Sequence, residues 1–184
     1  VPAILQFFLM VPSDGIDLST MQYIAYGASP ITEDVLVKSM EQFGCSFFQV
    51  YGMTETCGAG TTLPPEDHGA DADPGLLRSA GKPIRGMEMK IVDPDSGETV
   101  PDGEVGEVWM RHSGIMKGYW NMPEESAKVM PGEGWLRSGD IAYMVDGYLY
   151  IHDRVKDMII SGGENVYPAE IENALMSHEG IADV

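Results

Sequence analysis

The sequence predicts an α/β fold that continues into a smaller β region. Two patterns carry this prediction: residues 21–51 read as strand, helix and strand with short connections, and residues 87–151 hold apolar runs separated by turn residues. A hydrophobic content of 43% over 184 residues is enough for a packed core, so the acidic composition does not indicate disorder.

The βαβ pattern has clear local signals. Residues 21–26 read as a buried strand that leads into a Gly-Ala-Ser-Pro turn. A helix is predicted over Thr32–Phe43, with Thr32 as its N-cap and Gly44 just past its end. Ser46–Tyr51 is predicted to be the next strand, and the short connections place both strands in one sheet.

The later elements are predicted to be mainly β. Residues 62–77 are rich in Pro, Gly and Asp and read as an irregular surface loop. Strands are expected at residues 87–92, 104–111 and 141–151, and Asp146-Gly147 splits the last of these into a hairpin.

Two further helices are expected. One lies near Pro123–Met130, with Asn121 as its cap and Glu124 completing a capping box. The other follows a glycine pair and begins at Pro168, a residue well suited to a first helical turn.

Composition excludes some partners. With 29 acidic and 11 basic side chains the net charge is −18, which disfavours nucleic acid and anionic membranes. An anionic small molecule stays compatible where a few cations, backbone N–H groups or a metal line the site. Cys45 and Cys57 form no disulfide framework and fit a reducing, cytoplasmic compartment. The apolar run at residues 3–11 is far short of the about 20 residues that span a bilayer, so we expect no transmembrane segment.

A first candidate site is Tyr51–Thr56, just past the end of a strand, where open α/β sheets bind ligands. The hydroxyl of Thr54 and the carboxylate of Glu55 are suited to hold a phosphate oxygen and a Mg²⁺ together. Taken alone, these residues are more often a turn that exposes one acid.

A second candidate is Ser138–Asp140, where Asp140 is suited to accept two hydroxyl hydrogen bonds from a ribose. Its alternative role is to cap the turn locally. A third is the run from Asp153 to Glu172, where Arg154 and Lys156 stand out in an acidic chain and an Arg is well suited to phosphate. The alternative is a surface turn in which both cations are paired with Asp153 and Asp157.

The three candidate segments and their order along the chain resemble the AMP-forming acyl-CoA synthetase superfamily of adenylate-forming enzymes. The matching motifs are Tyr-Gly-Met-Thr-Glu, then Ser-Gly-Asp, then the long run from Asp153 to Glu172. Residues 160–168 (Ile-Ser-Gly-Gly-Glu-Asn-Val-Tyr-Pro) are most similar to fatty-acyl or aryl acid:CoA ligases. The resemblance runs from about Tyr23 to Val184. Because family enzymes are considerably longer, the chain is expected to be an internal fragment.

The resemblance also implies a domain organisation. Residues 1–155 would be the C-terminal part of a large ATP- and acyl-binding domain, with an α/β segment (1–61), a loop (62–80) and a β region resembling a distorted barrel (81–155). Residues 156–184 would be the hinge and the truncated start of a small α+β C-terminal domain.

Family members activate a carboxylic acid with Mg-ATP to an acyl-adenylate and pyrophosphate, then pass the acyl group to coenzyme A. The resemblance therefore implies ATP, Mg²⁺ and coenzyme A as ligands and a small carboxylic acid as substrate. It does not decide between fatty chains of different length and aryl acids, and it leaves a homodimer of the full-length protein open.

Roles carry over to matching positions. The residues that would bind ATP or AMP are Gly27, Ala28, Ser29, Gln49, Val50, Tyr51, Gly52, Met53, Thr54, Asp140 and Arg154. Thr54 would contact phosphate and Glu55 would ligate Mg²⁺. Asp140 would hold the ribose hydroxyls, with Arg154 reaching ribose or phosphate. Lys156 would lie at the hinge between the half-reactions, and the coenzyme A arm would approach Ser161, Gly162, Gly163 and Glu164.

Two family features are missing from the sequence. The phosphate loop that ends in Pro-Lys is absent, because residues 58–64 are similar but no Lys follows them, and the catalytic Lys near the family's C-terminus is absent as well. We therefore expect the 184 residues alone to form no acyl-adenylate. A non-catalytic homologue and an enzyme that delivers to a carrier protein stay as alternatives.

A calcium-binding module is a weaker alternative. Asp93, Asp95 and Glu104 have the spacing of an EF-hand loop, but Glu98 stands where that loop needs Gly and the flanks read as strands. Residues 93–97 are better interpreted as a hairpin turn.

Overall fold

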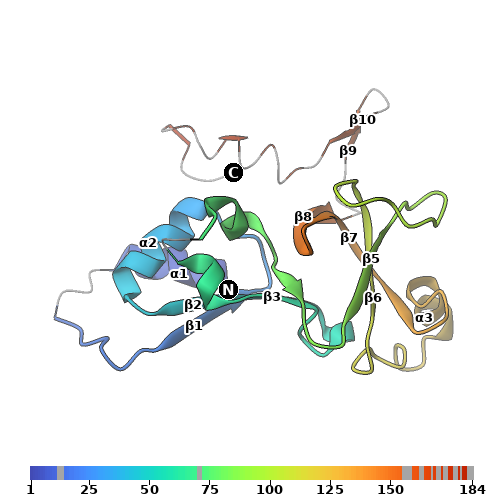
Figure 1. Cartoon of the computed structure of the whole chain (residues 1–184), viewed down its shortest axis with the longest axis horizontal. Coiled ribbons are helices and arrows are strands. Elements are labelled where there is room, and N and C mark those ends of the chain that lie inside the picture. Colours follow the sequence, from blue (N-terminus) through green and yellow to red (C-terminus); the bar gives the residue numbers. More distant parts are fainter. Residues whose placement is uncertain are drawn as a thin grey trace. The chain divides into compact units, whose positions relative to one another are not determined.

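The computed structural model describes residues 1–11, 15–69, 72–154, 159–161, 164–166, 168, 171, 174–175, 178 and 180–181 (Figure 1). The chain forms two compact units, Val1–Gly86 and Met87–Val184. Each unit has its own sheet, and the α/β fold class with a following β region is confirmed.

The first unit is built on a four-stranded sheet in the order β1-β2-β3-β4. The pair β1–β2 is parallel and the other two pairs are antiparallel. Its helices and strands are α1 (Pro2–Leu9), β1 (Tyr23–Gly27), α2 (Glu33–Phe43), β2 (Ser46–Tyr51), β3 (Thr61–Leu63) and β4 (Lys82–Pro83), with 3₁₀ turns η1 (Thr54–Thr56), η2 (Pro65–His68) and η3 (Pro74–Arg78).

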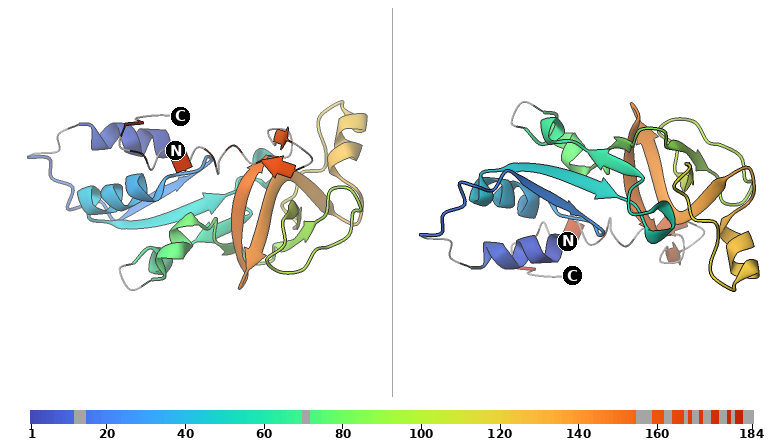
Figure 2. Two further views of the ribbon diagram at one scale, coloured as in Figure 1. Left: turned by 90° about the horizontal axis from the view of Figure 1, so that it is seen from above. Right: turned by 90° about the horizontal axis from the view of Figure 1, so that it is seen from below.

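The predicted βαβ unit is confirmed together with its caps. Thr32 accepts a hydrogen bond from the backbone N–H of Val35, and Gly44 ends α2 with φ 60°. Both α1 and α2 lie over the same side of β1 and β2 (Figures 1 and 2). There they bury a core centred on Leu5, Tyr26, Leu36 and Phe47, and this packing fixes the helices on one face of the sheet.

Residues 62–77 are more regular than the predicted loop. They include most of β3, all of η2 and most of η3. Leu63 is fully buried and His68 is 7% exposed. A run rich in Pro and Gly therefore still contributes a strand. β3 forms because it pairs with β2 and β4, and three residues are too few to show a periodic signal in the sequence.

The second unit holds an antiparallel sheet in the order β5-β6-β7-β8. Its elements are β5 (Glu88–Val92), β6 (Gly106–Arg111), α3 (Pro123–Val129), β7 (Trp135–Val145), β8 (Tyr148–Arg154), β9 (Ile159–Ser161) and β10 (Glu164–Val166). The predicted hairpin at Asp146-Gly147 is confirmed, since both residues have positive φ (52° and 79°) as a type I′ turn requires.

The predicted cap of the third helix is wrong. Met122 is the N-cap of α3, without a side-chain cap bond, and Asn121 is in the left-handed region with φ 54°. Ser126 secures the helix start instead, because its hydroxyl donates to the carbonyl of Met122 and accepts from the backbone N–H of Tyr119. The side chain that bonds to the start of α3 therefore comes from inside the helix and not from a capping residue before it.

The turn at residues 93–97 is the tight hairpin turn that the sequence predicted. Asp93 Oδ1 accepts bonds from the backbone N–H groups of Asp95 and Ser96 and from the Ser96 hydroxyl. The helix predicted from Pro168 lies largely outside the described residues. Among the helices that the structure describes, each is too short or too polar to cross a bilayer.

Candidate functional site

The first group of predicted site residues meets at one edge of the sheet in the first unit. Because β1 and β2 are parallel neighbours, their C-terminal ends lie together, with Gly27 opposite Val50. A Cβ at Gly27 would lie 2.0 Å from the carbonyl oxygen of Val50, so only glycine allows this approach. Ala28 follows in the left-handed region with φ 71°, and both it and Ser29 are exposed at the strand end.

The turn after β2 presents Thr54 and Glu55. Thr54 is exposed and Glu55 is half-buried in η1. Thr56 builds this turn: its hydroxyl accepts from the backbone N–H of Met53 at 3.1 Å and donates to the carbonyl of Met53 at 3.0 Å. Gly52 packs closely here, because a Cβ would lie 2.7 Å from the carbonyl oxygen of Gly58. The structural role of Thr56, which is 4% exposed, was not predicted from the sequence.

Gln49 lies beside Tyr26 and Leu63 in the sheet register. Its Oε1 atom is buried and has no hydrogen-bond partner within the described part of the chain. An unsatisfied buried acceptor is destabilising, and such groups are uncommon away from functional sites. This atom therefore suits a donor from a bound ligand, in line with the role that the resemblance implies for Gln49.

A buried pair supports the same sheet from within. The hydroxyl of Tyr26 lies 2.9 Å from Nε2 of His68, and Nδ1 of His68 lies 2.9 Å from the carbonyl oxygen of Pro64. Because a carbonyl only accepts, Nδ1 carries the proton and Nε2 accepts from Tyr26. Burial raises the pKa of Tyr26 above its usual range. Burial also lowers the pKa of His68, although its bond to Pro64 and the charge of Asp67 act in the other direction.

This pair predicts an acid-sensitive stability. The pKa of His68 is lowered from 6.5, so below that pH the unfolded chain binds a proton that the folded chain does not. The free energy of unfolding should therefore fall as the pH drops below 6.5, and His68→Gln should reduce this dependence. Urea unfolding at pH 7.5 and 5.5 measures it. The parent measured at the same two pH values is the control, and an unchanged pH dependence in the His68→Gln variant would contradict the prediction.

The second group of predicted residues lies in the second unit. Asp140 and Arg154 are register partners across β7 and β8, and their Oδ1 and Nε atoms lie 3.5 Å apart. The Asp140 side chain is 9% exposed and the Arg154 side chain is 61% exposed. Asp153, the neighbour proposed as an alternative partner of Arg154, accepts from the Arg154 backbone N–H. The structure therefore pairs the two residues that the resemblance assigns to the nucleotide.

The remaining predicted residues fall in the last segment. Ser161 and Glu164 are partners across the β9–β10 hairpin. Lys156, Gly162 and Gly163 lie outside the described residues. Their assigned roles at the hinge and toward coenzyme A therefore stay predictions.

A magnesium ion fits the first group. No cluster of three or more His, Cys, Asp or Glu side chains with metal-binding geometry occurs among the described residues. Mg²⁺ usually keeps several waters and takes one or two carboxylates plus substrate phosphates, so a single carboxylate such as Glu55 meets its protein requirement.

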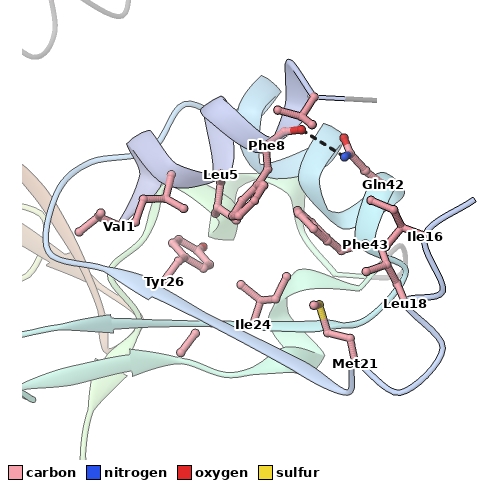
Figure 3. Close-up of a pocket in the computed structure, with 13 residues that line it drawn as sticks. Val1, Leu5, Phe8, Ile16, Leu18, Met21, Ile24, Tyr26, Gln42 and Phe43 are labelled. Atoms are coloured by element: carbon pink, nitrogen blue, oxygen red, sulfur yellow. Dashed lines mark hydrogen bonds between the residues drawn. The ribbon is translucent and has the colours of Figure 1, made fainter. Parts of the chain in front are cut away.

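A cavity of about 410 Å³ lies elsewhere in the first unit, between α1, α2 and β1 (Figure 3). Its walls are almost entirely apolar, with Leu5, Phe8, Ile24 and Phe43 among them. Gln42 closes one side, where its Nε2 donates to the carbonyl of Phe8 at 3.3 Å. None of the residues with a predicted ligand role lines this cavity, so it is separate from the strand-end group.

Comparison with known proteins supports the family that the sequence motifs resemble. A family model described as "AMP-binding enzyme" matches residues 1–120. The fatty acid–[acyl-carrier-protein] ligase ScoC of Streptomyces coeruleorubidus is 42% identical over 185 residues, which cover 100% of this chain and 35% of that protein. A feruloyl-CoA synthase of Amycolatopsis is 42% identical over 166 residues, which cover 90% of this chain and 32% of that protein. The chain thus spans about a third of the length of these relatives.

Similar solved structures also belong to adenylate-forming enzymes. The amide bond synthetase McbA from Marinactinospora thermotolerans has a TM-score of 0.88 at 36% identity, over 99% of this chain and 37% of that chain. The O-succinylbenzoate coenzyme A synthetase MenE from Bacillus subtilis, solved in complex with AMP, has a TM-score of 0.81 at 35% identity, over 99% of this chain and 36% of that chain. Together with a family match over residues 1–120, these similarities show that the chain belongs to the AMP-binding enzyme family of adenylate-forming enzymes.

Proposed function

We propose that the chain is part of an AMP-forming acid:CoA ligase, which activates a fatty or aryl carboxylic acid with Mg-ATP and transfers the acyl group to coenzyme A. The observation that carries the proposal is the η1 turn, which holds Thr54 and Glu55 at the C-terminal end of β2 in a member of the AMP-binding enzyme family. Fatty acid and feruloyl-CoA ligases among the relatives support the two substrate classes.

In this proposal the strand ends of the first unit bind the nucleotide. Residues 27–29 and 49–53 line the adenine and acyl side, where glycine at positions 27 and 52 lets backbone groups approach closely. Thr54 is exposed and contacts phosphate through its hydroxyl. Glu55 binds Mg²⁺, and that ion would offset the charge that grows on pyrophosphate as it leaves.

Asp140 and Arg154 bind the sugar side. The carboxylate of Asp140 is suited to accept hydrogen bonds from both ribose hydroxyls. The guanidinium of Arg154 is largely exposed and carries further donors for ribose or phosphate oxygens. The ion pair joins Nε of Arg154 to the carboxylate of Asp140, so the two side chains stand next to each other.

The acyl transfer step belongs to the last segment. We assign residues 156–184 to a hinge at Lys156 and the start of a small domain, and residues 1–155 to the large domain. Rotation about such a hinge would replace one face of the site by another between the two half-reactions. The glycine pair at 162–163, next to Ser161 and Glu164, would then admit the narrow pantetheine arm of coenzyme A.

Free coenzyme A and a carrier protein are compared as acyl acceptors, since one relative is named as a ligase for acyl carrier protein. The test uses a longer polypeptide that contains these 184 residues and is as long as the relatives. Acid-dependent ATP–pyrophosphate exchange is expected with fatty or aryl acids, followed by thioester formation with free coenzyme A. Thioester formation only with a pantetheinylated carrier protein would identify the alternative enzyme.

The same assay separates an enzyme from a non-catalytic homologue, because the latter would give no exchange with any acid. The isolated 184 residues serve as a control. They span about a third of the relatives, so we expect no exchange from them, and robust exchange would contradict that expectation.

A further inference from the structure

Glu107 is a buried acid that the proposed function does not use. It lies on β6 and is 2% exposed. Oε2 accepts from Nε1 of Trp109 at 3.1 Å and lies 2.9 Å from Nε and 2.8 Å from Nη2 of Arg137. Oε1 accepts from the backbone N–H of Gly139 at 3.2 Å. A carboxylate stays charged in the interior of a protein only when it is paired and hydrogen-bonded in this way.

The contact with Gly139 lies at an irregularity in the sheet. Trp109 pairs with Arg137, and Glu107 pairs with Ile141, so Val108 alone faces residues 138–140. The strand β7 therefore bulges by two residues. Gly139 adopts φ 75° within the bulge, and no other atom approaches its Cβ position within 4 Å, so the backbone conformation itself favours glycine.

Bonds to side chains replace the missing strand pairing in this bulge. Gly139 donates its N–H to Glu107, and Asp140 donates its N–H to the hydroxyl of Ser138 at 3.0 Å. Asp140 is the last residue of the bulge, and on its other side it pairs with Arg154 of β8. The conformation of the bulge thus determines where the Asp140 carboxylate stands.

We infer that Glu107 is a positioning residue, whose carboxylate holds the Ser138–Gly139 bulge so that Asp140 faces the ribose hydroxyls of the nucleotide. The inference rests on the proposed role of Asp140. Glu107 connects β6 and β7 by one side chain, and its Oε1 binds the amide of the residue that directly precedes Asp140, so it acts on the site without touching the ligand.

A simpler role for Glu107 would be to neutralise Arg137 and stabilise the sheet. The two roles differ in what they change. A purely structural acid affects the free energy of unfolding alone, whereas a positioning residue affects nucleotide affinity through Asp140. Double-mutant analysis separates them, because residues that act through each other are not additive.

The experiment compares Glu107→Gln, Asp140→Asn and the double variant in a polypeptide that carries this chain at the length of its relatives. E107Q leaves one oxygen for the donors of Gly139, Trp109 and Arg137. Loss of charge-assisted bonds of this kind should raise the KM for ATP about tenfold in the exchange assay. The double variant should differ from D140N by less than about twofold, since the effect passes through Asp140.

Glu88→Gln is the matched control. Glu88 also lies on a strand of this sheet and pairs with an arginine, Arg111, but it makes no contact with the bulge. Its KM for ATP should stay within about twofold of the parent, as expected for an exposed pair. Amide hydrogen exchange gives a second readout without nucleotide, since E107Q should speed exchange at Gly139 by about tenfold and E88Q should not.

If E107Q does not fold, Gly139→Ala replaces it, because it strains the bulge at φ 75° and leaves Glu107, Trp109 and Arg137 in place. It should raise the KM for ATP and be equally non-additive with D140N. A raised KM in D140N with no change in E107Q or G139A overturns the inference and leaves the proposed function intact. An unchanged KM in D140N overturns the role of Asp140 and the inference with it.

Discussion

Glu55→Gln should lower the rate of acid-dependent ATP–pyrophosphate exchange by about 100-fold or more. The substitution keeps the size of the side chain and removes the carboxylate that we propose to bind Mg²⁺, next to the exposed residue Thr54. In the proposed mechanism the metal would offset the charge of the leaving pyrophosphate, so its loss would act on the transition state and should lower kcat more than it raises the KM for the acid.

Raising the Mg²⁺ concentration provides a second measurement, because a weakened metal site should be partly rescued by excess metal. Glu66→Gln is the matched control: Glu66 is likewise an acid in the first turn of a 3₁₀ segment in the same unit, η2, but it is exposed and has no proposed ligand role. Equal exchange rates in E55Q and the parent would contradict the proposed role of Glu55.

Elements with local signals were predicted correctly from the sequence. The helix α2 carries its N-cap and its terminal glycine within its own segment, and the Asp146-Gly147 turn contains both residues that need positive φ. Such signals depend on neighbours in the chain, so a single sequence is sufficient to read them. The strand-end position of Thr54 and Glu55 followed from the same reasoning, because β1 and β2 are connected by one short crossover.

Contacts between distant segments escaped prediction. His68 bonds to Tyr26 across 42 residues, and Glu107 bonds to Gly139 across 32. Nothing in the spacing of these residues indicates that they meet, since their partners are set by the pairing of strands. The bulge opposite Val108 also results from the pairing of β6 with β7. Residues such as Glu107 that would position a ligand-binding side chain were therefore harder to predict than those that would touch the ligand.

The capping error at α3 has a different cause. Asn121 and Glu124 have the spacing of a capping box, yet Asn121 takes the left-handed conformation and Met122 stands at the N-cap. A cap residue needs an extended backbone. The turn at residues 118–122 imposes another conformation, in which the Ser126 hydroxyl bonds to the backbone of Tyr119 and Met122.

The largest effect on stability is expected from Gly81→Ala, which should lower the free energy of unfolding by about 3 kcal/mol or more. Gly81 has φ 85°, and a Cβ would lie 2.0 Å from the carbonyl oxygen and 2.1 Å from the carbonyl carbon of Thr62. These are backbone atoms in β3, so no side-chain rotation relieves the overlap. The variant must separate β3 from β4, whose pairing brings Thr62 opposite Lys82. Urea unfolding followed by circular dichroism measures the loss.

Gly44→Ala separates the steric effect from the backbone effect. Gly44 also has positive φ, 60°, but its Cβ position is open, with no other atom within 4 Å. Its substitution should therefore lower the free energy of unfolding by only about 1 kcal/mol, the strain of the left-handed conformation itself. The difference between the two variants then reports the contact between Gly81 and Thr62. Similar losses of unfolding free energy in both variants would show that β3 and β4 can move apart at little cost. The close approach of Gly81 to Thr62 would then not contribute to stability.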